Sequence, residues 1–331
     1  MRFLGVAQNK AGLMLSLSKH EPAKAFIPEE TPVTFFDPPK VIKTEVFAEV
    51  PEKYRKGGKV RGGHRRTTFL EGPSFDREGN LYCVDIPNGR IFRISPSGAF
   101  DVAAEYDGDP NGLKIHKDGR IFIADHRNGI MLMDPASGGV TPYLEGPIEQ
   151  ERFKGVNDLH FAANGDLYFT DQGQTGLHDP TGRVYRLTAD GALHCLLDTI
   201  PSPNGLVLNR SEKVVFVAVT RANAVWIVPM SERGGVSKVG LFVQLPCPGP
   251  DGMALDAKGS IAVAHPGLGV VWLFSNRGVP LYRVESCAGN MITNVAYGGE
   301  GRRFLYMTES HTGTILRAEM PTPGQPMYSH S

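Results

Sequence analysis

The chain has 331 residues, 41% of them apolar, and its 35 Lys and Arg residues balance 35 Asp and Glu residues. A formally neutral chain gives no support for nucleic acid or an anionic membrane as a partner, so we expect neither. The 39 Gly and 25 Pro residues supply turns for many short strands, and closed β architectures of this length commonly form one domain.

The beginning of the chain carries no strand pattern. Its two short apolar pieces, residues 3–7 and 13–17, are too short to span a membrane, and no cleavage site typical of a signal peptide follows them. We therefore expect residues 1–42 to form a poorly ordered tail and the protein to be cytoplasmic.

Two dissimilar segments come next. Residues 44–50 have the composition of a strand but belong to no repeated unit, whereas residues 53–66 are basic and punctuated by Gly. The second segment has no strand period, which is typical of a solvated loop.

From residue 71 onward the sequence repeats roughly every 40–47 residues, which is the period of four-stranded propeller blades. In each unit an oxygen-bearing residue precedes the first apolar run: Glu71, Asn111, Asn157, Asn204, Asp251 and Asn294. Runs with period-two alternation follow, and those expected as second strands are 81–85, 121–125, 167–171, 215–218, 261–265 and 305–309.

The last unit lacks a fourth run, because the sequence becomes Pro-rich after Glu319. The stretch at 44–50 suits that place, and pairing there joins the two ends of the ring and removes exposed sheet edges. We therefore predict an all-β, six-bladed β-propeller over residues 43–320. An N-terminal strand completes the last blade, and residues 321–331 form a C-terminal tail.

The six leading residues occupy equivalent positions of a radial repeat, so they should face one axis. Two carboxylates and four amides would form a hard, oxygen-rich site, which suits a divalent cation such as Ca²⁺ or Mg²⁺. Asn or Asp before Gly also suits a turn, where the side chain bonds nearby backbone. Glu71 fits that alternative poorly, because Glu is a poor turn residue.

The second strand of each blade should end at the same mouth, because it runs antiparallel to the first. These ends carry His126, Gln172 and His265. We interpret them as groups that face a substrate, although a His that closes a strand is also consistent with a hydrogen-bonded surface group.

Taken together, the blade motifs resemble the family of senescence marker protein, gluconolactonase and luciferin-regenerating enzyme. The resemblance covers roughly residues 43–320 and rests on Glu71-Gly72-Pro73, Asn157-Asp158, Pro203-Asn204-Gly205-Leu206, Pro250-Asp251-Gly252-Met253 and Tyr306-Met307-Thr308-Glu309. It implies one divalent metal at the axis, with Glu71, Asn204 and Asp251 in the places of its ligands. Asn157 takes the place of a substrate-contacting residue or a fourth ligand.

The resemblance also implies a hydrolase that opens a small-molecule lactone or ester. We expect Ca²⁺, or otherwise Mg²⁺, Mn²⁺ or Zn²⁺, to polarise the carbonyl and bind the attacking water. Asp251 would accept the proton of that water, Asn157 would assist it, and Asn111 would contact the substrate. A monomer or a homodimer is expected.

One position departs from the family pattern. The branch similar to regucalcin has an Arg two residues before the substrate-contacting Asn, and this chain has Gly155 there. We expect Arg65 or Arg66, in the basic loop, to supply the cationic contact instead, and the substrate to be a less hydroxylated or aromatic lactone or ester.

Other interpretations stay open at this level. The same mouth could serve an arylesterase, a phosphotriesterase or an isomerase, or the propeller could bind a metal without turnover. The axial carboxylates argue against the last of these. Of four scattered cysteines, Cys247 and Cys287 lie at neighbouring blade entrances, where a disulfide is conceivable.

Overall fold

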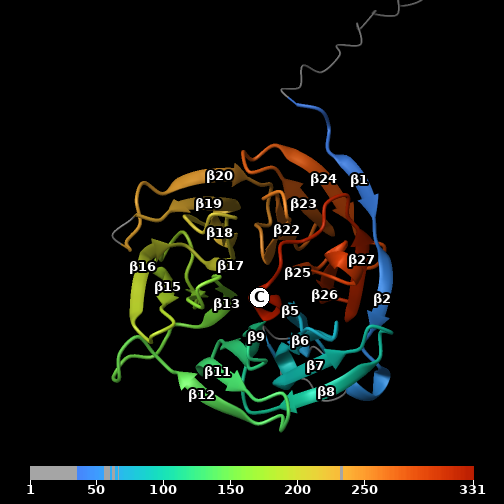
Figure 1. Ribbon diagram of the computed structural model, residues 1–331, viewed down its shortest axis with the longest axis horizontal. Helices are drawn as coiled ribbons and strands as arrows, with labels where there is room; N and C mark the ends of the chain where they lie inside the picture. The colour runs from blue at the N-terminus through green and yellow to red at the C-terminus, as the bar shows by residue number, and fades with distance from the viewer. Residues whose placement is uncertain (1–35, 56–59, 62–63, 66, 232–233) are drawn as a thin grey trace, which may run out of the picture. The chain divides into compact units, whose positions relative to one another are not determined.

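Six antiparallel sheets stand around a central axis in the computed structural model, which describes residues 36–55, 60–61, 64–65, 67–231 and 234–331 (Figure 1). The sheets belong to one compact unit, Pro38–Ser331. Each sheet has its first strand at the axis and the following strands successively farther out. The expected six-bladed β-propeller is therefore confirmed.

The first three blades each contain four consecutive strands. Blade 1 consists of β5 (Leu70–Phe75), β6 (Leu81–Asp85), β7 (Arg90–Ile94) and β8 (Phe100–Glu105). Blade 2 consists of β9 (Pro110–Ile115), β10 (Ile121–Asp125), β11 (Gly129–Met133) and β12 (Val140–Leu144). Blade 3 consists of β13 (Val156–Phe161), β14 (Leu167–Asp171), β15 (Gly182–Leu187) and β16 (Leu193–Ile200).

The last three blades include the two strands from the N-terminal side. Blade 4 consists of β17 (Pro203–Leu208), β18 (Val214–Val219), β19 (Ala224–Pro229) and β20 (Gly240–Gln244). Blade 5 consists of β21 (Met253–Leu255), β22 (Ile261–His265), β23 (Val270–Phe274), β24 (Pro280–Glu285) and the added β1 (Lys40–Lys43). Blade 6 consists of β25 (Ile292–Gly298), β26 (Phe304–Glu309), β27 (Thr314–Glu319) and β2 (Glu45–Glu49).

The ring is closed by β2, which pairs antiparallel with β27 from Glu45 opposite Arg317 to Glu49 opposite Thr314. This confirms the closing strand expected at 44–50. A further strand, β1, pairs parallel with β24 of blade 5, so consecutive segments bind two neighbouring blades. The expected domain boundary at residue 43 falls at the end of β1, and residues 1–35 of the expected tail lie outside the described residues.

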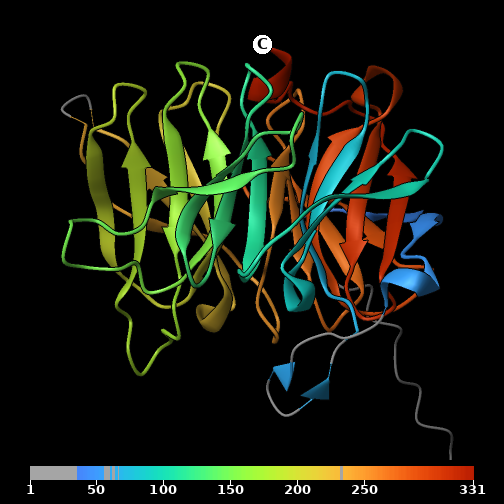
Figure 2. The same cartoon turned by 90° about the horizontal axis from the view of Figure 1, so that it is seen from below.

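The segment expected as a C-terminal tail packs against the propeller near its axis (Figure 1). Gln325 donates its backbone N–H to the carbonyl of Leu255, and the Tyr328 ring lies 5.2 Å from the ring of Phe161. Tyr328 opens the 3₁₀-helix η5 (Tyr328–His330) and is 8% exposed. Figure 2 shows η5 at one face of the ring and the short hairpin of β3 (Val60–Arg61) and β4 (His64–Arg65) at the other.

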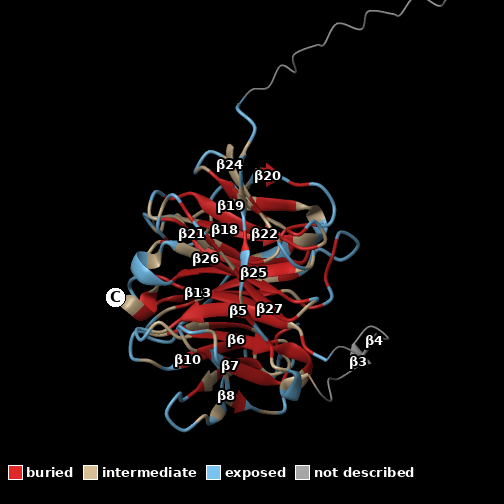
Figure 3. Ribbon diagram, turned by 90° about the vertical axis from the view of Figure 1, so that its right-hand side faces the viewer, coloured by how far each residue is buried: buried red, intermediate tan, exposed pale blue. Residues whose placement is uncertain are grey.

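The core lies between blades, because alternate side chains of a strand point to opposite faces of its sheet. On β26, for example, Leu305 and Met307 pack toward blade 5, whereas Tyr306 packs against Phe75 of blade 1. The inner strands of the blades are buried along most of their length, whereas the outermost strands and many loops are half-buried or exposed (Figure 3).

Helical structure in the described ranges is confined to five 3₁₀ turns: η1 (Glu52–Tyr54), η2 (Ile86–Asn88), η3 (Thr220–Ala222), η4 (Glu300–Arg302) and η5. None of these is a helix of the length and apolarity that a membrane crossing requires. The four cysteines are free thiols, so the disulfide considered for Cys247 and Cys287 is not formed.

Candidate axial site

The leading residues of the repeats gather where the innermost strands begin. Glu71, Asn157, Asn204 and Asn294 lie near the starts of β5, β13, β17 and β25, and Asp251 lies two residues before β21. A shift of register interrupts the pairing of these four strands with their neighbours at this level. Such bulges change the direction in which side chains point, here near the start of each innermost strand.

The glycines that follow the leading residues have a packing role. A Cβ atom at Gly252 would lie 2.0 Å from Asn294 Oδ1, and one at Gly205 would lie 2.5 Å from the carbonyl oxygen of Asp251. Innermost strands of neighbouring blades therefore approach closely only because these residues have no side chain. The turn interpretation of these Asn-Gly and Asp-Gly pairs does not apply, since the pairs line the axis.

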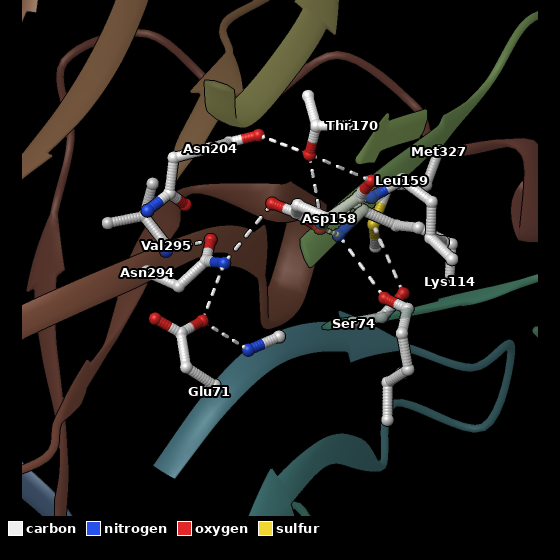
Figure 4. A network of polar contacts seen from close by, with 12 residues as sticks. Glu71, Ser74, Lys114, Asp158, Leu159, Thr170, Asn204, Asn294, Val295 and Met327 are labelled. Atoms are coloured by element: carbon white, nitrogen blue, oxygen red, sulfur yellow. Dashed lines mark hydrogen bonds and ion pairs between the residues drawn. The ribbon is translucent and has the colours of Figure 1, made fainter. Parts of the chain in front are cut away.

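Asn294 holds two carboxylates together at the axis (Figure 4). Its Nδ2 donates to Glu71 Oε2 at 2.8 Å and to Asp158 Oδ2 at 3.2 Å. Its Oδ1 accepts the backbone N–H of Val295 at 2.8 Å. The nitrogen and the oxygen of this amide are thus both hydrogen-bonded, and the amide connects the carboxylates of two blades.

Asp158 is an axial residue that the sequence reasoning did not single out. It is 3% exposed, its Oδ1 accepts the N–H of Leu159 at 2.8 Å, and Lys114 Nζ lies 3.8 Å from the same oxygen. Adjacent strand residues normally face opposite sides, but the irregular pairing between Val156 and Leu159 changes that geometry. A carboxylate inside an apolar innermost strand was the available signal, because burying one is costly.

The pKa values of two axial carboxyl groups are raised. Burial raises the pKa of Glu71 to about 7, hydrogen bonds from Asn294 and Gly72 oppose the shift, and the charge of Asp158 adds to it. Burial also raises the pKa of Asp251, and the charges of Glu71 and Asp158 raise it further against a hydrogen bond with Asn204. The protein's own groups therefore balance the negative charge of the axial carboxylates poorly.

This donor set fits a hard divalent cation. In the described residues, no group of three His, Cys, Asp or Glu side chains is arranged to hold a metal ion. A cation at the axis would therefore take amide oxygens together with carboxylates, which is the mixture that Ca²⁺ accepts. Glu71, Asn204 and Asp251 offer such a set, because Asp251 interacts with both of the others.

The orientation of Asn157 is set from the rim of the site. Its Nδ2 donates to Gln172 Oε1 at 2.9 Å, and Gln172 Nε2 donates to Ser202 Oγ at 2.9 Å. Because Gln172 uses its oxygen on Asn157 and its nitrogen on Ser202, the Asn157 amide is held with its nitrogen toward Gln172. Its Oδ1 is thereby directed away from Gln172.

The expected histidines occupy different environments. A Cβ atom at Gly155 would lie 2.3 Å from Cε1 of His126, so the His126 ring fills the space that a larger residue at 155 would need. His265 is fully buried, and its Nδ1 accepts from Trp272 Nε1 at 3.0 Å. Its Nε2 contacts the carbonyls of Pro246 and Pro248, so both ring nitrogens are used within the protein.

The remaining expected contacts lie at the mouth or outside the described part. Asn111 is half-buried on β9. The side chain of Arg65 and the whole of Arg66 lie outside the described residues. Beside Gln172 a surface groove is lined by Leu177, His178, Ser202 and Arg221, among others.

Comparison with known proteins gives consistent results. Residues 69–311 match the family described as SMP-30/Gluconolactonase/LRE-like region. The lactonase drp35 of Staphylococcus aureus is 30% identical over an alignment of 237 residues that covers 65% of this chain and 69% of that protein. A gluconolactonase of Zymomonas mobilis is 28% identical over an alignment of 284 residues that covers 76% of this chain and 79% of that protein.

Solved structures agree with the fold. A calcium-binding protein described as regucalcin from Agrobacterium tumefaciens has a TM-score of 0.70 at 22% identity, over 88% of this chain and 99% of that one. A gluconolactonase from Xanthomonas campestris has a TM-score of 0.69 at 21% identity, over 87% of this chain and 99% of that one.

Proposed function

Because the chain belongs to the SMP-30/gluconolactonase/LRE-like family, we propose that it is a hydrolase that opens a lactone with a divalent cation bound at the propeller axis. The family membership confirms the resemblance inferred from the blade motifs. The observation that carries the proposal is that the carboxyl groups of Glu71, Asp158 and Asp251 lie near enough at the propeller axis to interact electrostatically. Relatives named lactonase and gluconolactonase support the choice of a cyclic ester as substrate.

Glu71, Asn204 and Asp251 would hold the cation, with the Asp158 carboxylate close by. The preference for Ca²⁺ is supported by the oxygen-only donors and by the calcium-binding relative from Agrobacterium tumefaciens. When bound, the cation supplies a Lewis acid for the lactone carbonyl and for the attacking water.

Asp251 acts as the general base. As a carboxylate at the cation site, it would lie beside the attacking water and can accept a proton from it. It takes a proton from the water as the water oxygen bonds to the carbonyl carbon. The ring carbon–oxygen bond then breaks, and the proton passes to the released oxygen, which gives a hydroxy acid.

Asn157 assists by hydrogen bonding at the reacting end of the lactone, in the orientation that Gln172 holds. The groove beside Gln172 would receive the ring substituent of the lactone. Its lining includes Leu177, which is 70% exposed, and Arg221. Such a mixed lining suits a substituent with both apolar and polar parts.

The experiment that tests the proposal is a substrate screen with chelated and cation-restored protein. Neutral and anionic lactones are compared with aryl esters and phosphotriesters. We expect lactones to be opened, activity to disappear on chelation and Ca²⁺ or Mn²⁺ to restore it. Turnover of aryl esters or phosphotriesters with no lactone opened would contradict the proposal, and so would lactone opening that survives full chelation.

A further inference from the structure

A lysine lies beside one of the axial carboxylates, that of Asp158. Lys114 is on β9, and its side chain is 16% exposed. Its Nζ lies 3.8 Å from Asp158 Oδ1 and donates to the carbonyl of Leu113 at 3.2 Å (Figure 4). The residue also lines a cavity of about 140 Å³ in the channel, where Met327 and Tyr328 belong to the wall.

A largely buried ammonium is costly unless an opposite charge compensates it. Asp158 provides that charge, but Asp158 also belongs to the group of carboxylates that includes Glu71 and Asp251. Lys114 therefore contributes to the charge balance of the whole axial site. The side chains that connect the carboxylates, Asn204 and Asn294, carry no charge.

The formal charges of Glu71, Asp158, Asp251 and Lys114 give the net charge of the axial site. With a cation bound, the three carboxylates would be ionised and would contribute three negative charges, and Lys114 contributes one positive charge. Two negative charges are left, which is the amount that one divalent cation neutralises. A monovalent cation would leave one negative charge in a poorly hydrated place, and a trivalent cation would leave one positive charge.

We propose that Lys114 is a specificity-determining residue that sets the charge of the axial site to match one divalent cation. The inference rests on the proposed function, because it concerns the cation proposed there. Without Lys114 the carboxylates would hold three uncompensated charges, and the site would favour a trivalent ion more strongly. A purely structural role for the Lys114–Asp158 pair would leave the preference between cations unchanged.

The test compares Ca²⁺ with Tb³⁺, which is of similar size and also prefers oxygen ligands but carries one more charge. Chelated wild-type protein and the Lys114→Met variant are titrated calorimetrically with each ion. A unit charge within several ångströms of the cation should change the ratio of the two dissociation constants by roughly tenfold or more. We expect Lys114→Met to shift that ratio toward Tb³⁺ by this factor.

Three further variants complete the design. Lys114→Arg keeps the charge and should keep the wild-type ratio, and Lys114→Gln supplies the charge-free comparison if the Met variant does not fold. Lys117→Met removes an exposed lysine of the same blade, which lies 5.5 Å from the Tyr328 ring, and should leave the ratio unchanged.

The outcomes separate the two proposals. If wild-type protein binds Ca²⁺ but the charge-free variants keep its cation ratio, the role of Lys114 is refuted and the proposed function stands. If wild-type protein binds neither ion at the axis, the proposed function fails and the role of Lys114 fails with it.

Discussion

At the scale of single residues, two asparagines at equivalent blade positions form different hydrogen bonds. Asn294 uses its Nδ2 on the carboxylates of Glu71 and Asp158, whereas Asn157 uses its Nδ2 on Gln172 at the rim. The repeat in the sequence makes these positions look alike. Their contacts differ because the partners come from other strands and loops. The repeat therefore predicted the ring, whereas the roles assigned to its members came from the family resemblance.

We predict that Gln172 is a positioning residue for Asn157. Gln172→Met removes the acceptor of Asn157 Nδ2, and the loss of one hydrogen bond should lower kcat roughly three- to tenfold with little change in KM. Ser202→Ala removes the next link and should lower kcat less. Steady-state kinetics of both variants and of the double variant measure these effects.

The double variant provides the control. Residues of one hydrogen-bonded chain should be non-additive, so it should be no worse than Gln172→Met alone. Strictly additive losses in kcat would show that the two residues act independently, and a change in KM alone would indicate a direct substrate contact for Gln172.

A second residue-scale prediction concerns His265 and acid stability. Burial lowers its pKa below the ordinary value of 6.5, so the folded protein favours the neutral ring, which accepts from Trp272. The stabilising contribution is complete above the unfolded pKa and is lost as the pH falls through that value toward the lower folded pKa. We expect the melting temperature of wild-type protein to fall more steeply from pH 7 to pH 5 than that of His265→Gln. Parallel melting curves for the two proteins would contradict this assignment.

At the scale of elements, the alternating runs were the most predictable part. The second strands expected at 81–85, 121–125, 167–171 and 261–265 coincide with β6, β10, β14 and β22, because each is a short apolar run that recurs in every repeat and is bounded by turns. β1 was not predicted, since its four residues form a short strand whose partner, β24, lies far away in the sequence. The packing of residues 321–331 against the propeller was also not predicted, because it depends on contacts with distant strands and not on a local periodicity of the sequence.

The two N-terminal strands give a prediction about ring closure. Val50 and Ala48 are almost fully buried near β27, so removing residues 1–50 should expose the edge of blade 6 and lower the melting temperature by at least about 5 °C. Removing residues 1–37 should change it little, because the propeller unit begins at Pro38. Scanning calorimetry of both truncations is the measurement.

An intermediate truncation separates the contributions of the two strands. Removal of residues 1–43 deletes β1 and keeps β2, so it should have a smaller effect than removal of residues 1–50. Equal melting temperatures for all three truncations would mean that β2 does not close the ring.

At the scale of the whole molecule, the fold, the family and the ring of oxygen-bearing residues could be predicted from the sequence. All three depend on a repeat whose members are far apart in the chain but equivalent in space. Asp158 and Lys114 were missed because their importance comes from contacts between neighbouring blades, which no spacing in the sequence encodes. The cationic role expected for Arg65 and Arg66 stays a prediction.

The central claim is that the axial carboxylates bind one divalent cation, and calorimetric titration of chelated protein with Ca²⁺ tests it most directly. We predict one ion per chain for wild-type protein and an affinity loss of roughly a hundredfold for Glu71→Gln and Asp251→Asn, because each removes a charged ligand. Both variants should remain folded, since neutralising either group relieves repulsion between buried carboxylates. Asp190→Asn, which changes an exposed carboxylate outside the channel, should bind like wild-type protein. Equal Ca²⁺ binding by all four proteins, or none by the wild type, would contradict the account.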